Sequence, residues 1–196
     1  MNSVNVKFRY SDSLRVIHRQ TIFVTSLFDM PHYVRELRPV RVVSIIQPEL
    51  QPERPPELPA AAHLRVGIHD ISEHREDHIL AERADIESLI EFVHGWAPDE
   101  GPFLTHCYAG VSRSTATALI AATVKTGDPR WSAIRLRAAS PHAYPNRRII
   151  ALADDILGLD GELIDACHAM GEATARVVEG PLTVLRIGDE QRKQRL

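Results

Sequence analysis

The stretch from residue 103 to residue 115 constrains the fold of this chain more than any other. The apolar run Phe103-Leu104-Thr105 leads into His106-Cys107, and five residues separate Cys107 from Arg113, where an alanine-rich, helix-forming segment begins. This order predicts a buried strand that passes through a tight loop into a helix. Five residues are enough to curl the backbone into a cup, whose inward N–H groups at a helix N-terminus bind anions.

The residue types in this loop suit nucleophilic chemistry on a phosphate ester. Gly110 allows the tight curl, because glycine adopts a positive φ without steric cost. Arg113 can hold two phosphate oxygens with its fork of donors. Cys107 lies at the base of the cup, where the helix dipole, the inward N–H groups and the guanidinium all favour the thiolate. The thiolate is the nucleophilic form of cysteine.

The string from His106 to Ser114 resembles the signature of the cysteine-dependent protein tyrosine phosphatases. Its form, His-Cys-x-x-Gly-x-Ser-Arg-Ser, is most similar to that of the dual-specificity-like and small bacterial members. The resemblance is specific over 101–115, moderate over 64–127 and loose elsewhere. It implies a phosphoric monoester hydrolase, a protein tyrosine phosphatase that forms a cysteinyl-phosphate and needs no cofactor and no metal. The implied substrate is a phosphorylated protein or a small aryl phosphate.

The resemblance also implies roles for the residues around Cys107. Ser114 donates its hydroxyl to the cysteine sulfur and makes the thiolate a better leaving group when the intermediate breaks down. His106 braces the cup and activates the cysteine. Pro145-Asn146 resembles a pair found downstream in dual-specificity-like members, where we interpret it as support for the fold. The phosphate-binding residues are expected to be Tyr108, Ala109, Gly110, Val111, Ser112 and Arg113, with Ser112 and Val111 acting mainly through their backbone.

A general acid must protonate the leaving oxygen, and its conjugate base can then activate water. In the resembled family this acid is an Asp on a loop that precedes the Cys, and Asp70 and Asp77 both fit. We prefer Asp70, because it ends a strand that should run parallel to the Cys107 strand, so both side chains emerge at one edge of the sheet. The loop 72–80 is longer and more charged than the resemblance implies.

Short β-branched runs alternate with helical patterns along the chain, which implies βαβ crossovers. We therefore expect an α/β fold, with a mostly parallel sheet of four to five strands flanked by helices on both faces. Five prolines between residues 47 and 59 predict an irregular loop. Strands are expected at 22–27, 41–46, 63–68 and 103–105, and helices after Asp29, over 80–95, over 114–126, from Asp128, from Asn146 and over 161–178.

Particular residues mark the ends and faces of these helices. Asp29 and Asn146 are expected to cap helix starts, and Gly127 to close the helix that follows the cup. Ile134 should lie on the apolar side of its helix together with Trp131 and Leu136. Residues 1–20 fit a hairpin or an edge strand.

The composition bounds the class of protein. A chain of 196 residues with 44% hydrophobic residues suits one phosphatase domain over 1–196, with 1–20 and 191–196 peripheral or frayed. The net charge of −3 argues against nucleic acid and against anionic membranes as partners. Cys107 and Cys167 do not make a disulfide framework, so a reducing cytoplasm is the expected location. The oligomeric state is left open.

Other functions remain open at this point. A phosphate- or phosphopeptide-binding pseudophosphatase is one, and a dual-specificity or small-molecule phosphatase of the same fold is another. His69-Asp70 and His74-x3-His78 would suit a metal-dependent phosphohydrolase, but such enzymes are helical bundles and this His-Asp pair follows a strand. Low-molecular-weight phosphatases carry Cys-x5-Arg near the N-terminus, unlike this chain. In the resembled family, phosphoinositide-directed members tend to carry Lys or Asp in the cup. The uncharged Tyr108, Ala109 and Val111 therefore favour phosphotyrosine, or a generic aryl phosphate, over polyphosphorylated lipids or inositols.

Overall fold

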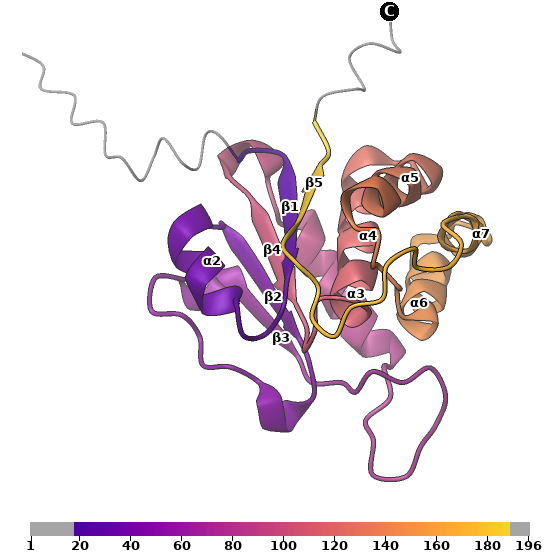
Figure 1. The fold of residues 1–196 in the computed structure, drawn as a ribbon, viewed down its shortest axis with the longest axis horizontal. Helices are drawn as coiled ribbons and strands as arrows, with labels where there is room; N and C mark the ends of the chain where they lie inside the picture. The colour runs from indigo at the N-terminus through magenta and orange to yellow at the C-terminus, as the bar shows by residue number, and fades with distance from the viewer. Residues whose placement is uncertain (1–17, 189–196) are drawn as a thin grey trace, which may run out of the picture.

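A five-stranded sheet forms the centre of the computed structural model, which describes residues 18–188 (Figure 1). The strand order is β3–β2–β4–β1–β5. The first four strands are parallel to one another and β5 is antiparallel to β1. The expected fold class, a mostly parallel α/β sheet, is therefore confirmed. The strands are Thr21–Thr25 (β1), Arg41–Ile45 (β2), His63–Val66 (β3), Phe103–His106 (β4) and Thr183–Arg186 (β5).

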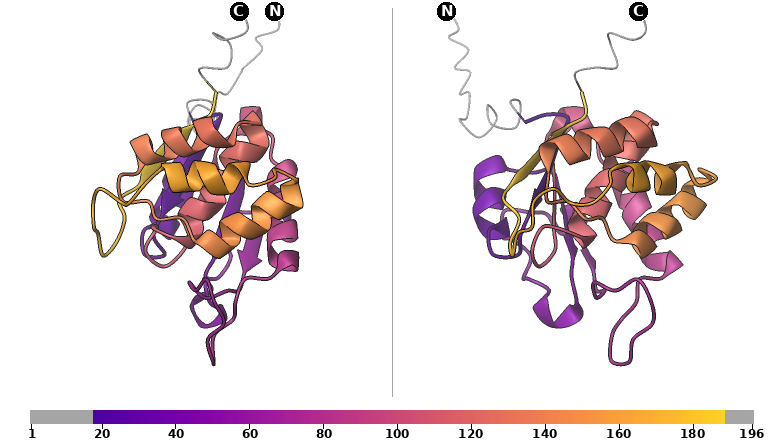
Figure 2. Two further views of the ribbon diagram at one scale, coloured as in Figure 1. Left: turned by 90° about the vertical axis from the view of Figure 1, so that its right-hand side faces the viewer. Right: turned by 45° about the vertical axis from the view of Figure 1, so that its right-hand side comes forward.

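Helices cover both faces of the sheet, as expected (Figures 1 and 2). One face packs against α2 and against Leu58 and Ala62 of the segment before β3, and the opposite face packs against the other helices, with α3 and α4 against the sheet. The expected hairpin or edge strand at the N-terminus lies, up to residue 17, outside the described residues. The helices are Met30–Leu37 (α2), Arg83–His94 (α3), Arg113–Thr126 (α4), Pro129–Ala139 (α5), Arg147–Leu157 (α6) and Glu162–Ala169 (α7).

The helix α4, which follows the cup, is the most deeply buried helix of the fold. It packs against α3, α5, α6 and β1, and nearly all of its first three turns are buried. The alanines at 116, 118, 121 and 122 allow this close approach, because they add no bulk between the helices. The start of α4, and with it Arg113, is therefore held in a close-packed part of the molecule.

The parallel strands end at one edge of the sheet, and this edge gathers the residues of interest. His106 at the end of β4 pairs in register with Thr25 of β1 and with Ser44 of β2. The segments that follow β1, β2, β3 and β4 therefore leave the sheet at a common edge, where ligands bind in open α/β sheets.

The C-terminal part of the described chain differs from expectation. The helix expected over 161–178 ends at Ala169, and Gly171 follows with a positive φ of 68°. The β-branched residues Thr174, Val177 and Val178 then disfavour a helix. This segment instead returns to the sheet without regular structure and adds β5, a strand that the short run at 183–186 did not reveal.

Two smaller expectations were also wrong. Asp29 occupies the cap position of α2, but its side chain makes no capping hydrogen bond, and the Asp29 N–H instead donates to Ser26 Oγ at 3.2 Å. Ile134 is 61% exposed, because α5 turns this residue away from its neighbours. Other end signals are confirmed, since Gly127 is left-handed and Asn146 Oδ1 accepts the first N–H groups of α6.

Candidate active site

The loop between β4 and α4 forms a cup whose carbonyl groups are held from outside. Within residues 18–188, the backbone N–H groups of residues 108–112 have no hydrogen-bond partner. An anion in the cup can therefore use these N–H groups without displacing an internal hydrogen bond. The carbonyl oxygens of Tyr108, Ala109 and Val111 accept hydrogen bonds at 3.0, 2.7 and 2.9 Å from the N–H groups of Leu27, Gly180 and Tyr144, respectively.

Gly110 fits the tightest point of this loop. Its φ is +73°, and an added Cβ would lie 3.0 Å from the carbonyl carbon and oxygen of Thr25 at the end of β1. The loop therefore needs glycine here for two reasons, the left-handed backbone and the close contact with β1.

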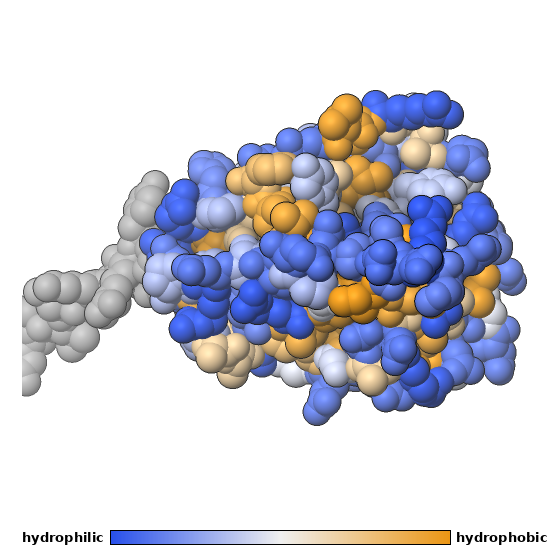
Figure 3. All heavy atoms as spheres, turned by 90° about the horizontal axis from the view of Figure 1, so that it is seen from below, coloured by the Kyte–Doolittle hydropathy of each residue, from blue (hydrophilic) through white to orange (hydrophobic). Residues whose placement is uncertain are grey.

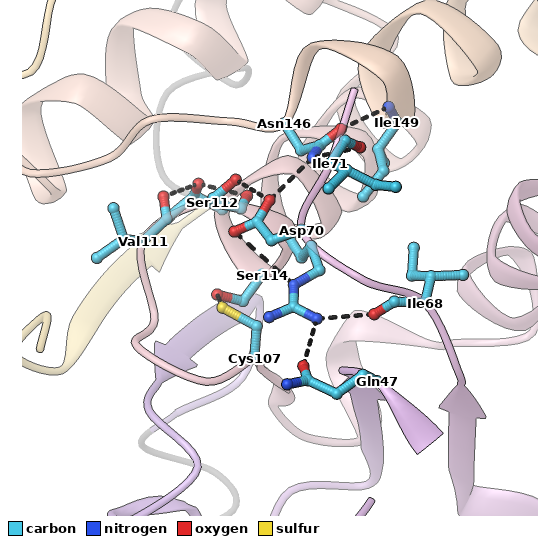
Figure 4. A network of polar contacts seen from close by, with 12 residues as sticks. Gln47, Ile68, Asp70, Ile71, Cys107, Val111, Ser112, Ser114, Asn146 and Ile149 are labelled. Atoms are coloured by element: carbon cyan, nitrogen blue, oxygen red, sulfur yellow. Dashed lines mark hydrogen bonds and ion pairs between the residues drawn. The ribbon is translucent and has the colours of Figure 1, made fainter. Parts of the chain in front are cut away.

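Cys107 lies at the base of a cavity of about 400 Å³, which Arg113 and Asp70 also line. The residue is only 2% exposed, yet its side chain faces this cavity and is not enclosed by apolar groups on all sides. Its Sγ lies 3.0 Å from Ser114 Oγ in the first turn of α4 (Figure 4). The structure thus brings Ser114 to the sulfur, where the resemblance placed it.

Arg113 makes hydrogen bonds from one end of its guanidinium and none from the other. Its Nη1 donates to the Ile68 carbonyl oxygen at 2.7 Å and to Gln47 Oε1 at 3.1 Å. Its buried Nε and its Nη2 have no hydrogen-bond partner among residues 18–188. Since buried polar groups are nearly always paired, an unpaired edge of this kind marks a place for an acceptor, and two phosphate oxygens fit it.

Asp70 reaches the cup from the end of β3 and is held by two neutral donors. Its Oδ1 accepts from Ser112 Oγ at 2.7 Å and from Asn146 Nδ2 at 2.9 Å (Figure 4). Its Oδ2 lies 3.8 Å from Arg113 Nε. The cup, the end of β3 and the start of α6 therefore meet at this carboxylate.

Asp77, the other candidate acid, is not at the cup. It is exposed, has a positive φ of 58°, and does not line the cavity. The loop that carries it projects from the body of the protein (Figure 2). Of the two aspartates, the structure brings only Asp70 to Cys107 and Arg113.

His106 lies under the cup as a neutral, buried imidazole. Burial is the main cause that lowers its pKa to about 4, and nearby His63 and Arg113 lower it further, against a hydrogen bond to Cys107. Its Nε2 is 2.6 Å from Ser44 Oγ, and its Nδ1 is 3.3 Å from the Cys107 carbonyl oxygen. His106 therefore braces the loop and places no positive charge beside the Cys107 sulfur at neutral pH.

Three polar contacts of this site were not expected from the sequence. Gln47 anchors Arg113, the Ser112 hydroxyl binds Asp70, and Asn146 binds Asp70 although it was interpreted only as support for the fold. The capping signal at Asn146 was consistent with a second contact, because a cap uses Oδ1 and leaves both N–H groups of the amide free to donate to another residue. Nothing local to Gln47 marks its role.

Comparisons with known proteins bear on the fold of the chain. No protein-family model and no curated protein sequence matches the chain. Solved structures match, among them PTP-2 phosphatase of Cydia pomonella, with a TM-score of 0.52, 22% identity, and coverage of 84% of this chain and 93% of that chain. DUSP15 matches with a TM-score of 0.56, 18% identity, and coverage of 80% and 94%. The chain has the fold of the dual-specificity phosphatases.

A third match, PTPMT1 in complex with PI(5)P, has a TM-score of 0.51 at 14% identity and covers 73% of this chain and 97% of that chain. The family resemblance seen in residues 106–114 is thus confirmed at the level of the dual-specificity phosphatase fold.

The part of the chain that the structure describes contains neither a cluster of metal ligands nor a membrane-spanning helix. Over residues 18–188, no three His, Cys, Asp or Glu side chains converge as metal ligands, and no helix is long and apolar enough to cross a bilayer.

The second cysteine of this dual-specificity phosphatase fold lies far from the cup in sequence and on α7. Cys167 is half-buried and free, and burial is the main cause that raises the pKa of its thiol. A protonated thiol of this kind behaves as a small apolar side chain. The two cysteines therefore occupy very different surroundings.

Proposed function

We propose that the protein is a phosphoric monoester hydrolase that uses Cys107 as its nucleophile, and that it acts as a protein tyrosine phosphatase. One observation carries the proposal. One cavity is lined by Cys107, by Arg113, whose Nε makes no hydrogen bond, and by Tyr108, Ala109, Val111 and Ser112, whose backbone N–H groups make none. A tetrahedral dianion above the sulfur would satisfy all of these donors at once.

In the first step, the Cys107 thiolate attacks phosphorus in line with the leaving oxygen. The S–P bond forms as the P–O bond to the leaving group breaks, while Arg113 and the loop N–H groups stabilise charge on the equatorial oxygens. Asp70, in its protonated form, gives its proton to the leaving oxygen. Its contacts with Ser112 and Asn146 keep the carboxyl group at the mouth of the cup.

In the second step, water hydrolyses the cysteinyl-phosphate. Asp70 takes a proton from the water as the water oxygen bonds to phosphorus, and the S–P bond breaks to return the thiolate and inorganic phosphate. The Ser114 hydroxyl, 3.0 Å from the sulfur, stabilises the departing thiolate by a hydrogen bond.

The mouth of the cavity favours an aryl phosphate. Tyr108 lines the cavity and packs edge-to-face against Phe28 with ring centroids 5.4 Å apart, and both rings are exposed. Aromatic side chains in such pairs offer an apolar wall to a further ring. A phosphotyrosine side chain therefore gains contacts that a phosphoserine or phosphothreonine side chain does not reach.

The test compares Cys107→Ser with Cys167→Ser on phosphotyrosine and phosphothreonine peptides. We expect Cys107→Ser to abolish turnover while it still binds phosphate, and Cys167→Ser to keep turnover. Substantial turnover by Cys107→Ser would refute the mechanism. A wild-type protein that binds phosphopeptides without hydrolysing them would instead be a pseudophosphatase, and equal rates on the two peptides would refute the preference for tyrosine.

A further inference from the structure

The loop 72–80 presents its charges unequally to the catalytic cavity. Arg75 and His78 line the same cavity as Cys107, whereas the acidic residues of this loop do not line it. The excluded acidic residues are Glu73, Glu76 and Asp77. The charge that the loop turns to the cavity is therefore that of the Arg75 guanidinium, which makes this surface cationic, although the loop as a whole carries three carboxylates against this one guanidinium.

This cationic surface is built by a defined turn. The His78 N–H donates to the Arg75 carbonyl oxygen at 3.2 Å, and the left-handed Asp77 lies between them. A closed turn of this type brings its first and last residues close together. Arg75 and His78 are thus neighbours, and the Arg75 guanidinium has no hydrogen-bond or ion-pair partner within residues 18–188.

The turn is fixed to the edge of the sheet beside Asp70. The His69 N–H donates to the Ile79 carbonyl oxygen at 2.9 Å, and the Ile79 N–H donates to His69 Nδ1 at 3.0 Å. The rings of His69 and His78 lie 4.8 Å apart, and the outer Nε2 of His69 lies 4.0 Å from Glu49. The return of the loop is therefore fixed next to the general acid, so Arg75 and His78 keep their place relative to the cup.

We propose that Arg75 and His78 form a subsite for a second anionic group, which a phosphopeptide substrate carries beside its phosphotyrosine. This inference rests on the proposed function and names its substrate class. The cup holds one phosphate with Arg113, and Arg75 offers an unpaired, fork-shaped donor set to a carboxylate or a second phosphate at the cavity mouth. The uncharged cup and the exposed Phe28–Tyr108 pair on the same rim favour a peptide over a polyphosphorylated lipid headgroup. Figure 3 shows the molecule from below relative to Figure 1, and apolar side chains lie among polar ones on this side.

The test uses phosphotyrosine peptides that differ only in flanking residues, either Asp and Glu or their amides Asn and Gln. We expect the wild-type protein to prefer the acidic peptide by about tenfold in kcat/KM, the effect of one charge-assisted hydrogen bond. Arg75→Gln should bring this ratio close to one. The matched control is Arg130→Gln, which removes the same charge from the exposed start of α5 and should leave the ratio unchanged.

Two results with these peptides would overturn the subsite. One is a wild-type protein with no preference between the peptides, and the other is an equal fall of the ratio in Arg75→Gln and Arg130→Gln. A third arm uses soluble dioctanoyl phosphatidylinositol bisphosphate, and dependence on Arg75 for this lipid alone would also contradict a peptide subsite. Affinities of the Cys107→Ser background for the same peptides give the ratio without turnover, so the subsite is decided even if the proposed hydrolase activity fails.

Discussion

Asn146 has two roles, as the cap of α6 and as a hydrogen-bond donor to Asp70, and a single substitution can separate them. Its Oδ1 accepts from the N–H groups of Arg148 and Ile149 at 3.1 and 3.2 Å and caps α6. Its Nδ2 donates to Asp70 Oδ1 at 2.9 Å. Serine caps helices as well as asparagine does, but its side chain is too short to reach Asp70. Asn146→Ser should therefore keep the helix cap and release one of the two donors on the general acid.

The structure sets the size of this effect. A hydrogen bond to a charged group contributes about 1.5–3 kcal/mol, which corresponds to about 10- to 100-fold in rate if it acts only through positioning. Because Ser112 still holds Asp70 at 2.7 Å, we expect the lower end, a loss of about tenfold in kcat/KM. The free energy of unfolding should fall by about 1–3 kcal/mol, because the cap remains but Asp70 and the Ile71 carbonyl oxygen lose a donor.

The assay compares phenyl phosphate with p-nitrophenyl phosphate and measures urea unfolding in parallel. The loss should be large for phenyl phosphate and small for p-nitrophenyl phosphate, whose leaving group departs without a proton. Asp128→Ala is the control, since it removes a cap of α5 far from the cup and should lower stability by about 1 kcal/mol with unchanged kinetics. Equal losses of Asn146→Ser on both substrates would refute the idea that Asn146 acts through Asp70.

Two further predictions concern stability. Gly110→Ala should destabilise the fold by about 1–3 kcal/mol and abolish turnover, because its φ is +73° and the new Cβ meets backbone at 3.0 Å. Gly127→Ala is its control in urea unfolding, since its φ of +71° is similar but nothing lies within 4 Å, and equal costs would contradict the steric argument. Burial lowers the pKa of both His63 and His106 to about 4, so below pH 6.5 the unfolded chain binds more protons than the folded one. Stability should therefore be full above pH 6.5 and fall towards pH 4, by up to about 3 kcal/mol for His106 alone. Unfolding midpoints across this range measure it, and a His63→Gln variant with an unchanged pH slope would show that His63 contributes nothing.

The local part of the site was predictable from the sequence because its geometry is local. Cys107 and Arg113 belong to one loop, and the spacing between them already fixes how the loop must curl before α4. Asp70 was also within reach, because parallel strands end at a common edge and its strand could be recognised from its apolar run. The contrast between Asp70 and Asp77 then follows from distance to that edge.

The missed contacts join segments that are distant in sequence. Gln47 and Arg113 are 66 residues apart, and Asp70 and Asn146 are 76 apart, so no spacing rule connects them. The helix expected over 161–178 was too long, because Gly171 takes a positive φ directly after α7. The strand β5 was not predicted from the sequence. A four-residue edge strand gains its stability from pairing with β1, and its own sequence carries little signal.

The most direct test of the central claim looks for the intermediate itself. Protein mixed with excess p-nitrophenyl phosphate is quenched in acid within one turnover, digested, and analysed by mass spectrometry. The account predicts one phosphate on the peptide that contains Cys107, with more of it in an Asp70→Ala variant, where hydrolysis of the intermediate is slower. Turnover without this adduct, or with the phosphate on another residue, would contradict the account.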